Sequence, residues 1–93
     1  MNTAKFYHLR DGVQVRKERF GLLFYDYRGP RLYFVPTKNL IENHFFNGTE
    51  TAESLIEFIR TRHHQTLQAS QKWVMQVLTT LEQKGLIHEQ PVC

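Results

Sequence analysis

Cysteine is almost absent from this chain. Cys93 is the only cysteine among the 93 residues, and it is also the last residue. A single terminal cysteine cannot close an internal disulfide, and it cannot supply the several thiolates of a cysteine-cluster metal site. The sequence therefore excludes disulfide scaffolds and cysteine-cluster metal proteins, and we expect Cys93 to be a solvent-exposed thiol without a chemical role.

Long apolar runs are missing as well. The first ten residues contain Lys5, His8 and Arg10, but no apolar segment of the length found in a signal peptide. No stretch of the chain approaches the roughly 18 apolar residues of a membrane span. We expect a cytoplasmic protein that has no membrane partner.

Catalytic motifs are the third absence. The chain contains no Gly-rich phosphate loop and no nucleophile elbow. His63 and His64 are adjacent, so on a helix end they point about 100° apart and cannot share one metal ion. His44 lies on an otherwise apolar face and is expected at the edge of the core, and Asn47-Gly48-Thr49 is interpreted as a helix-ending turn rather than a glycosylation site. The sequence favours a binding module with no catalytic residue, no metal and no cofactor over an enzyme.

Composition is that of one small globular domain. Hydrophobic residues make up 41% of the chain, charged residues 23%, and the net charge is +3. We expect a single domain over residues 1–93, with an ordered core over about 8–89. The basic residues are scattered rather than gathered on one stripe, so the charge fits an acidic peptide partner about as well as it fits DNA.

A β-hairpin is the clearest local pattern. Residues Leu22 to Tyr27 and Arg31 to Val35 are rich in aromatic and branched side chains, and Arg28-Gly29-Pro30 between them supplies turn residues. Val13 to Arg16 alternates apolar and polar residues, which predicts a short strand before the hairpin. Because Pro36 follows Val35, we expect the strand 31–35 to stay unpaired on its outer side, where an open edge can accept a peptide.

Three helices are predicted after the strands. The first runs from the capping residue Thr37 to about Phe46 and is closed by Asn47-Gly48. The second is capped by Thr51 and ends near Arg62, and the third is capped by Ser70 and ends at Lys84-Gly85. Leu86-Ile87 is expected to be an apolar contact and residues 90–93 a loose tail. Three strands followed by three helices predict an α+β fold with a three-stranded antiparallel sheet.

One flank of the third helix is a candidate binding surface. Trp73, Val77, Thr80 and Lys84 lie along one side of the stripe that is expected to face the core. A large aromatic side chain beside such a stripe is often part of the core, and the alternative is that this flank forms the wall of a groove beside the open strand. The candidate peptide-binding residues are Arg31, Leu32, Tyr33, Phe34, Val35, Trp73, Val77, Thr80 and Lys84.

The chain resembles a known family in three segments. Residues 15–26 (VRKERFGLLFYD), then 29–32 (GPRL) and later 81–87 (LEQKGLI) resemble the mycofactocin-system peptide chaperone family, MftB, and more loosely its relative PqqD of pyrroloquinoline quinone biosynthesis. The likeness covers about residues 8–89. Its most specific part is the approach to the hairpin, Arg16-x-Glu18-x-Phe20-Gly21. Lys17 stands where the family pattern has Pro, and Asn47-Gly48 stands where relatives have Asp-Gly.

The resemblance implies a RiPP recognition element, a winged-helix-like domain that binds ribosomally made precursor peptides. Such a domain binds the leader segment of the precursor and presents the peptide to a modifying enzyme, here a radical SAM maturase. In this family the leader adds as a strand to the third strand and lies against the third helix, and the chaperone binds no iron–sulfur cluster.

Two alternatives remain open at this level. A winged-helix DNA-binding protein would use similar helices and a hairpin wing, although the predicted third helix offers only Lys72 and Lys84 as cations. Pairing of the strand 31–35 between two copies would give a homodimer, which is compatible with peptide binding if the peptide displaces the second copy.

Overall fold

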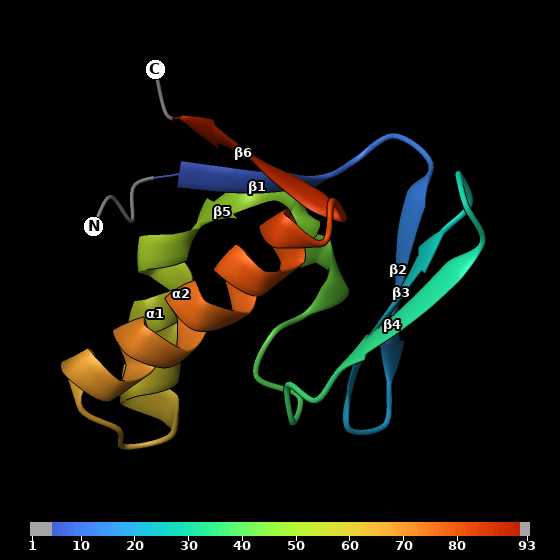
Figure 1. Ribbon diagram of the computed structural model, residues 1–93. Coiled ribbons are helices and arrows are strands. Elements are labelled where there is room, and N and C mark those ends of the chain that lie inside the picture. Colours follow the sequence, from blue (N-terminus) through green and yellow to red (C-terminus); the bar gives the residue numbers. More distant parts are fainter. Residues whose placement is uncertain (1–4, 92–93) are drawn as a thin grey trace.

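The computed structural model describes residues 5–91, which form two antiparallel sheets and two α-helices (Figure 1). One sheet has the strand order β2-β3-β4 and the other β5-β1-β6. The elements are β1 Lys5–Leu9, β2 Val13–Glu18, β3 Gly21–Asp26, β4 Arg31–Val35, the 3-10 helix η1 Asn43–Phe46, β5 Asn47–Thr51, α1 Ala52–Arg62, α2 Leu67–Gln83 and β6 Ile87–Pro91. The α+β class is confirmed, whereas the prediction of one three-stranded sheet followed by three helices is wrong in both counts.

The β2-β3-β4 sheet contains the predicted hairpin. Leu22 pairs with Val35 and Asp26 with Arg31, so the two strands are in register over their whole length. β2 extends beyond the predicted Arg16 to Glu18, where it pairs with Gly21. A side chain at Gly21 would overlap the Val35 carbonyl oxygen, so this close approach of β4 to the start of β3 requires glycine.

The β5-β1-β6 sheet was not predicted. β1 lies between β5 and β6 and pairs with β6 from Lys5↔Pro91 to Leu9↔Ile87. Residues 90–91 therefore belong to a strand rather than a loose tail, while Cys93 lies outside the described residues. Tyr7 and Ile87 are buried between this sheet and the helices, which accounts for the pairing of segments from opposite ends of the chain.

The predicted helix from Thr37 to Phe46 does not form. Lys38 and Asn39 have positive φ angles of 52° and 64°, which a right-handed helix does not allow. Only residues 43–46 make a 3-10 turn, and the adjacent Phe45 and Phe46 are both buried. Asn47-Gly48, expected to end a helix, instead begins β5. Burial of these two phenylalanines thus overrides the helical periodicity of the segment.

The two α-helices begin at threonine caps. The Ser54 N–H donates to Thr51 Oγ1 over 3.1 Å at the start of α1, as predicted, and α1 ends at Arg62. α2 begins three residues before the predicted cap, because the Ala69 N–H donates to Thr66 Oγ1 over 3.1 Å. Ser70 is instead a buried residue of the first turn of α2. At the other end, Gly85 has a φ of 73° and terminates α2 as expected.

The core joins the two helices to both sheets. α1 and α2 pack side by side beneath the β5-β1-β6 sheet, and the β2-β3-β4 sheet stands beside the C-terminal end of α2 (Figure 1). Phe24 of β3 meets Phe46 edge to face at 5.3 Å between ring centroids, which links the hairpin sheet to the main core. No helix among residues 5–91 is long and apolar enough to cross a membrane.

Candidate peptide-binding groove

A groove lies between β4 and α2. Its central pocket has a volume of about 180 Å³. The lining residues are Tyr33, Val35, Trp73, Gln76, Val77, Thr80 and Leu81. Five of these seven were predicted from the sequence, and they come from two elements that are well separated along the chain. Helical spacing from Trp73 and Thr80 would also have found Gln76, whereas Leu81 was assigned only to the core stripe.

The alternation of side chains between the two faces of a strand explains which β4 side chains enter the groove. Tyr33 lies opposite Phe24, and Val35 lies opposite Leu22, so both share the inner face of the sheet with buried residues of β3. Trp73 and Val77 are one helical turn apart on α2 and pack partly buried against the core. The two interpretations of Trp73 therefore coincide, because its ring is both a core contact and a groove wall.

Leu32 and Phe34 do not line the central pocket. Their side chains alternate with Tyr33 and Val35, so they lie on the opposite, outer face of the sheet, where they are 64% and 44% exposed. Alternation along the strand thus keeps these two side chains out of the pocket, and their part in peptide binding stays a prediction.

The main-chain groups of Leu32 and Phe34 nevertheless face the open edge of β4. The Tyr27 N–H donates to the Gly12 carbonyl oxygen over 2.8 Å, one step beyond the pairing of Asp26 with Val13. Tyr27 therefore directs its main-chain groups to the β2 side. Consecutive residues of a strand direct these groups to opposite sides, so Asp26 directs its groups to β4, and so do Phe24 and Leu22.

Their partners on β4 therefore direct their own main-chain N–H and C=O groups to β3 and hydrogen-bond there. These partners are Arg31, Tyr33 and Val35. Leu32 and Phe34 direct theirs away from β3, and among residues 5–91 no strand pairs with that side of β4. The open edge therefore presents two N–H donors and two carbonyl acceptors.

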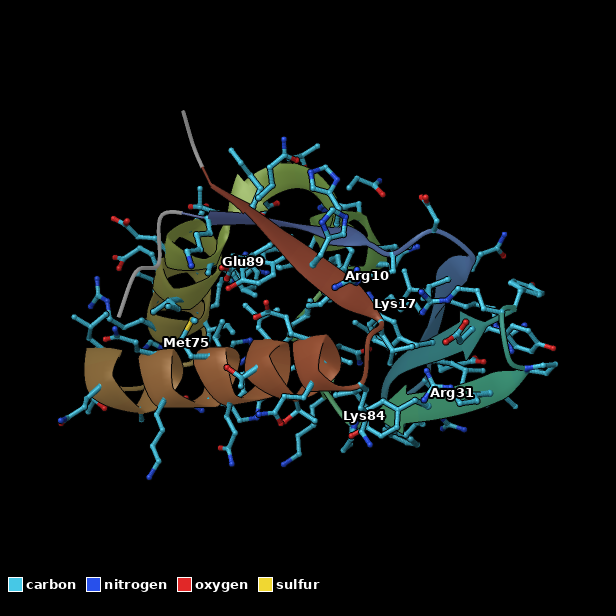
Figure 2. The ribbon with its side chains drawn as sticks, turned by 45° about the horizontal axis from the view of Figure 1, so that its top comes forward. Arg10, Lys17, Arg31, Met75, Lys84 and Glu89 are labelled. Carbon is cyan, nitrogen blue, oxygen red and sulfur yellow. The ribbon has the colours of Figure 1, made fainter. Side chains whose placement is uncertain are left out.

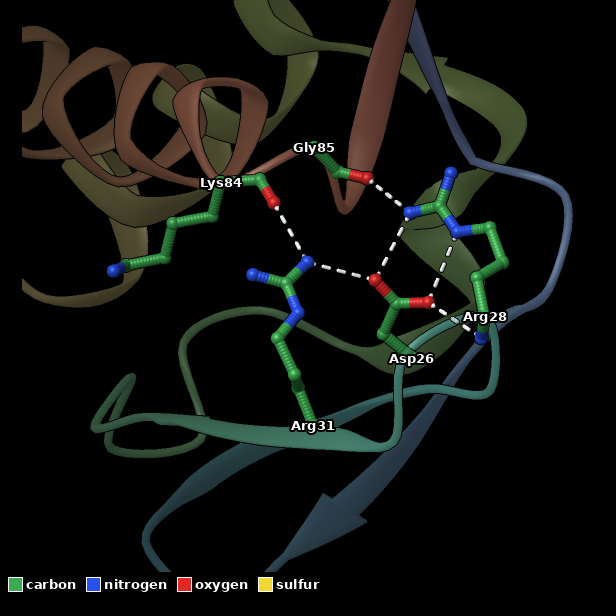
Figure 3. Close-up of polar contacts among 5 residues, drawn as sticks. All are labelled: Asp26, Arg28, Arg31, Lys84 and Gly85. Carbon is green, nitrogen blue, oxygen red and sulfur yellow. Dashed lines mark hydrogen bonds and ion pairs between the residues drawn. The ribbon is translucent and has the colours of Figure 1, made fainter.

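A polar cluster closes one end of the groove (Figure 3). Asp26 is buried, with only 3% of its side chain exposed, and accepts from Arg28 Nε over 2.9 Å and from Arg31 Nη2 over 2.7 Å. Arg28 Nη2 also donates to the Gly85 carbonyl oxygen over 2.8 Å, and Arg31 Nη2 donates to that of Lys84 over 3.2 Å. The cluster therefore ties the hairpin turn to the C-terminal end of α2.

The same cluster sets the charge of Asp26. Hydrogen bonds from Arg28 and then from Arg31 hold the pKa of the Asp26 carboxyl well below its usual value. Sequence reasoning named Arg31 but missed Asp26 and Arg28, although an acid at the end of a strand followed by two arginines across a tight turn was visible.

Two cations stand at this end of the groove. Arg31 of β4 and Lys84 at the end of α2 lie next to each other (Figure 2). The Lys84 Nζ sits 4.5 Å from the centroid of the Tyr33 ring, a cation–π contact that holds the ammonium over the groove wall. The candidate residues Arg31 and Lys84 thus lie at the cationic end of the groove.

The other end of the groove opens past Trp73. A second pocket of about 210 Å³ is lined by Pro36, Lys38, Leu40, Gln65 and Trp73. Trp73 borders both pockets, so the second pocket adjoins the groove beyond the end of β4 at Val35. A larger hollow of about 630 Å³ follows the exposed side of α2, but α2 alone lines it, so it has no opposing wall to hold a ligand.

The histidines are placed away from this groove. His44, expected at the edge of the core, has a side chain that is 55% exposed and lies 3.4 Å from Glu50. His63 and His64 are exposed at the end of α1. Within residues 5–91 no three His, Cys, Asp or Glu side chains are grouped so that they could hold a metal ion.

Comparison with known proteins gives one match. The family model described as the peptide chaperone MftB family matches residues 6–88. No curated protein and no solved structure matches the chain significantly. The matched segment includes β4, α2 and the whole of the groove between them.

Proposed function

Because this chain belongs to the peptide chaperone MftB family, we propose that it binds the leader segment of a ribosomally made precursor peptide as a strand added to β4. The bound peptide is then presented to a radical SAM maturase. The domain of residues 1–93 acts as one unit in this role, in the cytoplasm where the precursor is made.

The open edge of β4 is the observation that carries this proposal. Leu32 and Phe34 offer two donors and two acceptors that an extended peptide can satisfy without regard to its side chains. The edge strand contains no proline and no lysine, the residues that commonly protect exposed edges from pairing. Affinity then comes largely from main-chain bonds, and selectivity from the side chains beside them.

The groove supports a leader that carries both apolar and acidic residues. Side chains of the leader that point toward α2 meet Tyr33, Val35 and Trp73, which offer apolar and aromatic surface. At the cationic end, Lys84 and the net positive charge left by two arginines around one carboxylate, Asp26, favour a carboxylate of the leader. We therefore expect an acidic leader with apolar residues at the positions that face the groove.

The proposed role is that of a binding protein without chemistry of its own. The residues that form the groove are apolar, aromatic, amide, hydroxyl or cationic, and none is a nucleophile paired with a base. A second copy of the chain would compete with the leader for the same edge of β4, so any homodimer formed there would dissociate on peptide binding. No observation favours the DNA-binding alternative, and α2 contains only Lys72 as a basic residue before its cap Lys84.

The proposal is tested by binding and by mass spectrometry. The first probe is a fluorescein-labelled precursor, sought as a short open reading frame in the neighbourhood of the gene of this chain. The second is a labelled DNA duplex of mixed sequence. We expect saturable binding of the precursor at moderate salt, and no change in precursor mass after incubation with the chaperone alone. A steep salt-dependent affinity for the duplex without any response to the precursor would refute the proposal.

A further inference from the structure

The outer face of the β2-β3-β4 sheet carries large apolar side chains that the groove does not use. Leu32 is 64% exposed, Tyr27 56% and Phe34 44%. Beside them, Tyr25 and Leu23 are partly buried. A shallow hollow of about 390 Å³ lies over this face and is lined in part by Leu23, Tyr25, Tyr27 and Leu32. Contiguous exposed apolar side chains of this size mark an interaction surface on a small domain.

These side chains form rows that end at the open edge. Leu32 lies directly opposite Tyr25, and Phe34 lies opposite Leu23, so each pair makes a row across β3 and β4 on the outer face. A strand added to β4 necessarily extends both rows, because the residue opposite Leu32 or Phe34 points to the same face as its neighbour. The added strand would therefore place alternate side chains on this apolar surface.

We propose that the leader is bound on both faces of β4, with an outer subsite formed by Leu23, Tyr25, Leu32 and Phe34 in addition to the groove. This inference rests on the proposed addition of the leader to β4. The outer subsite takes apolar or aromatic side chains, because its two rows between β3 and β4 consist of leucine, tyrosine and phenylalanine side chains. Arg16, which continues the row of Leu23 on β2 and also lines the hollow, is paired with Glu18. The binding segment of the leader then contains an uninterrupted run of at least about three apolar or aromatic residues, rather than a strict alternation of apolar and polar ones.

We infer that the leader strand occupies the outer face, because this face is continuous with the open edge of β4. Leu32 and Phe34 supply the unpaired main-chain groups of the edge. Their side chains are also the exposed apolar side chains that β4 contributes to the outer face. A single bound strand therefore satisfies the edge and covers these side chains at once. Another protein docked on the sheet face alone would leave the donors and acceptors of the edge unpaired.

The test compares exposed apolar residues that are matched in size and exposure. Random dodecapeptides displayed on phage are selected against the immobilised chaperone, and one enriched peptide is synthesised with a fluorescein label. Its affinity is measured for Leu32→Ser and Phe34→Ser. The controls are Leu67→Ser and Phe58→Ser on the helices, where the side chains are 54% and 45% exposed. Serine keeps the backbone N–H, so the main-chain bonds of the edge are preserved in all four variants.

We expect each outer-face variant to weaken binding by about tenfold and each control by less than about twofold, with unchanged circular dichroism. Serine scanning of the peptide should weaken binding at successive positions of the run. If only alternate positions matter and both outer-face variants bind like their controls, the outer subsite is refuted while addition to β4 stands. If neither the selected peptides nor the precursor binds the wild-type chain, the proposed function fails as well. The peptide scan remains decisive even if a protein variant does not fold.

Discussion

Proline substitutions along β4 should separate binding from folding. Leu32 and Phe34 direct their N–H groups to the open edge, whereas Tyr33 and Val35 direct theirs to β3. Proline lacks the N–H and is tolerated on the outer side of an edge strand, but not where the group is bonded within the sheet. We therefore expect Leu32→Pro and Phe34→Pro to fold and to lose peptide affinity, and Tyr33→Pro and Val35→Pro to destabilise the hairpin.

The expected magnitudes follow from the number of main-chain groups involved. The open edge offers four bonds, at about 1 kcal/mol each, so removing one donor and placing a proline ring against the leader should weaken binding by about tenfold or more. Inside the sheet, Tyr33→Pro leaves the facing carbonyl of β3 unpaired, which costs about 1–3 kcal/mol. For a domain of this size that loss corresponds to a decrease in Tm of roughly 5–20 °C.

Thermal unfolding followed by circular dichroism measures the decrease in Tm, and fluorescence anisotropy with the labelled precursor measures the loss of affinity. Affinity is expressed per folded molecule, so that partial unfolding is not counted as weak binding. Two outcomes would show that the reasoning is wrong. The first is wild-type affinity in both Leu32→Pro and Phe34→Pro. The second is the reverse pattern, in which the Tm of these two variants decreases while Tyr33→Pro keeps the Tm of the wild type.

Three further predictions concern α2 and the closed end of the groove. Trp73→Ala should weaken leader binding by about 2 kcal/mol, measured by titration calorimetry on folded protein, because the ring borders both pockets of the groove; unchanged affinity would make Trp73 a core residue only. Lys84→Glu should slow association with an acidic leader and reduce its salt dependence in stopped-flow measurements, and an unchanged salt slope would argue against the cationic end. Asp26→Asn should lower the free energy of unfolding at neutral pH. Because the pKa of Asp26 is lowered in the folded state, its contribution is present above the unfolded value of about 4 and is lost as the pH falls below it. Denaturant titrations should therefore show a smaller loss of stability on acidification in the variant than in the wild type, and equal losses would contradict the role of the Asp26 cluster.

Local patterns were sufficient for several turns and helix ends. The hairpin from β3 to β4, the cap of α1 at Thr51 and the end of α2 at Gly85 were all visible, because turn residues, caps and periodicity act within a few positions of one another. The resemblance to the MftB family was likewise carried by short segments, and the family match agrees with it. Periodicity failed at residues 37–46, where Lys38 and Asn39 adopt positive φ angles and the phenylalanines are buried without a full helix.

The sequence by itself determined the family and the α+β class, and it predicted, as one of two interpretations, an edge strand next to a helix with an aromatic flank. Only the tertiary structure decided that β1, β5 and β6 form a second sheet, because β1 and β6 come from opposite ends of the chain and are joined by burial rather than by a local signal. It also decided which β4 residues face the open edge. That choice depends on the hydrogen-bond register between strands, and a shift of one residue would exchange Leu32 and Phe34 with Tyr33 and Val35.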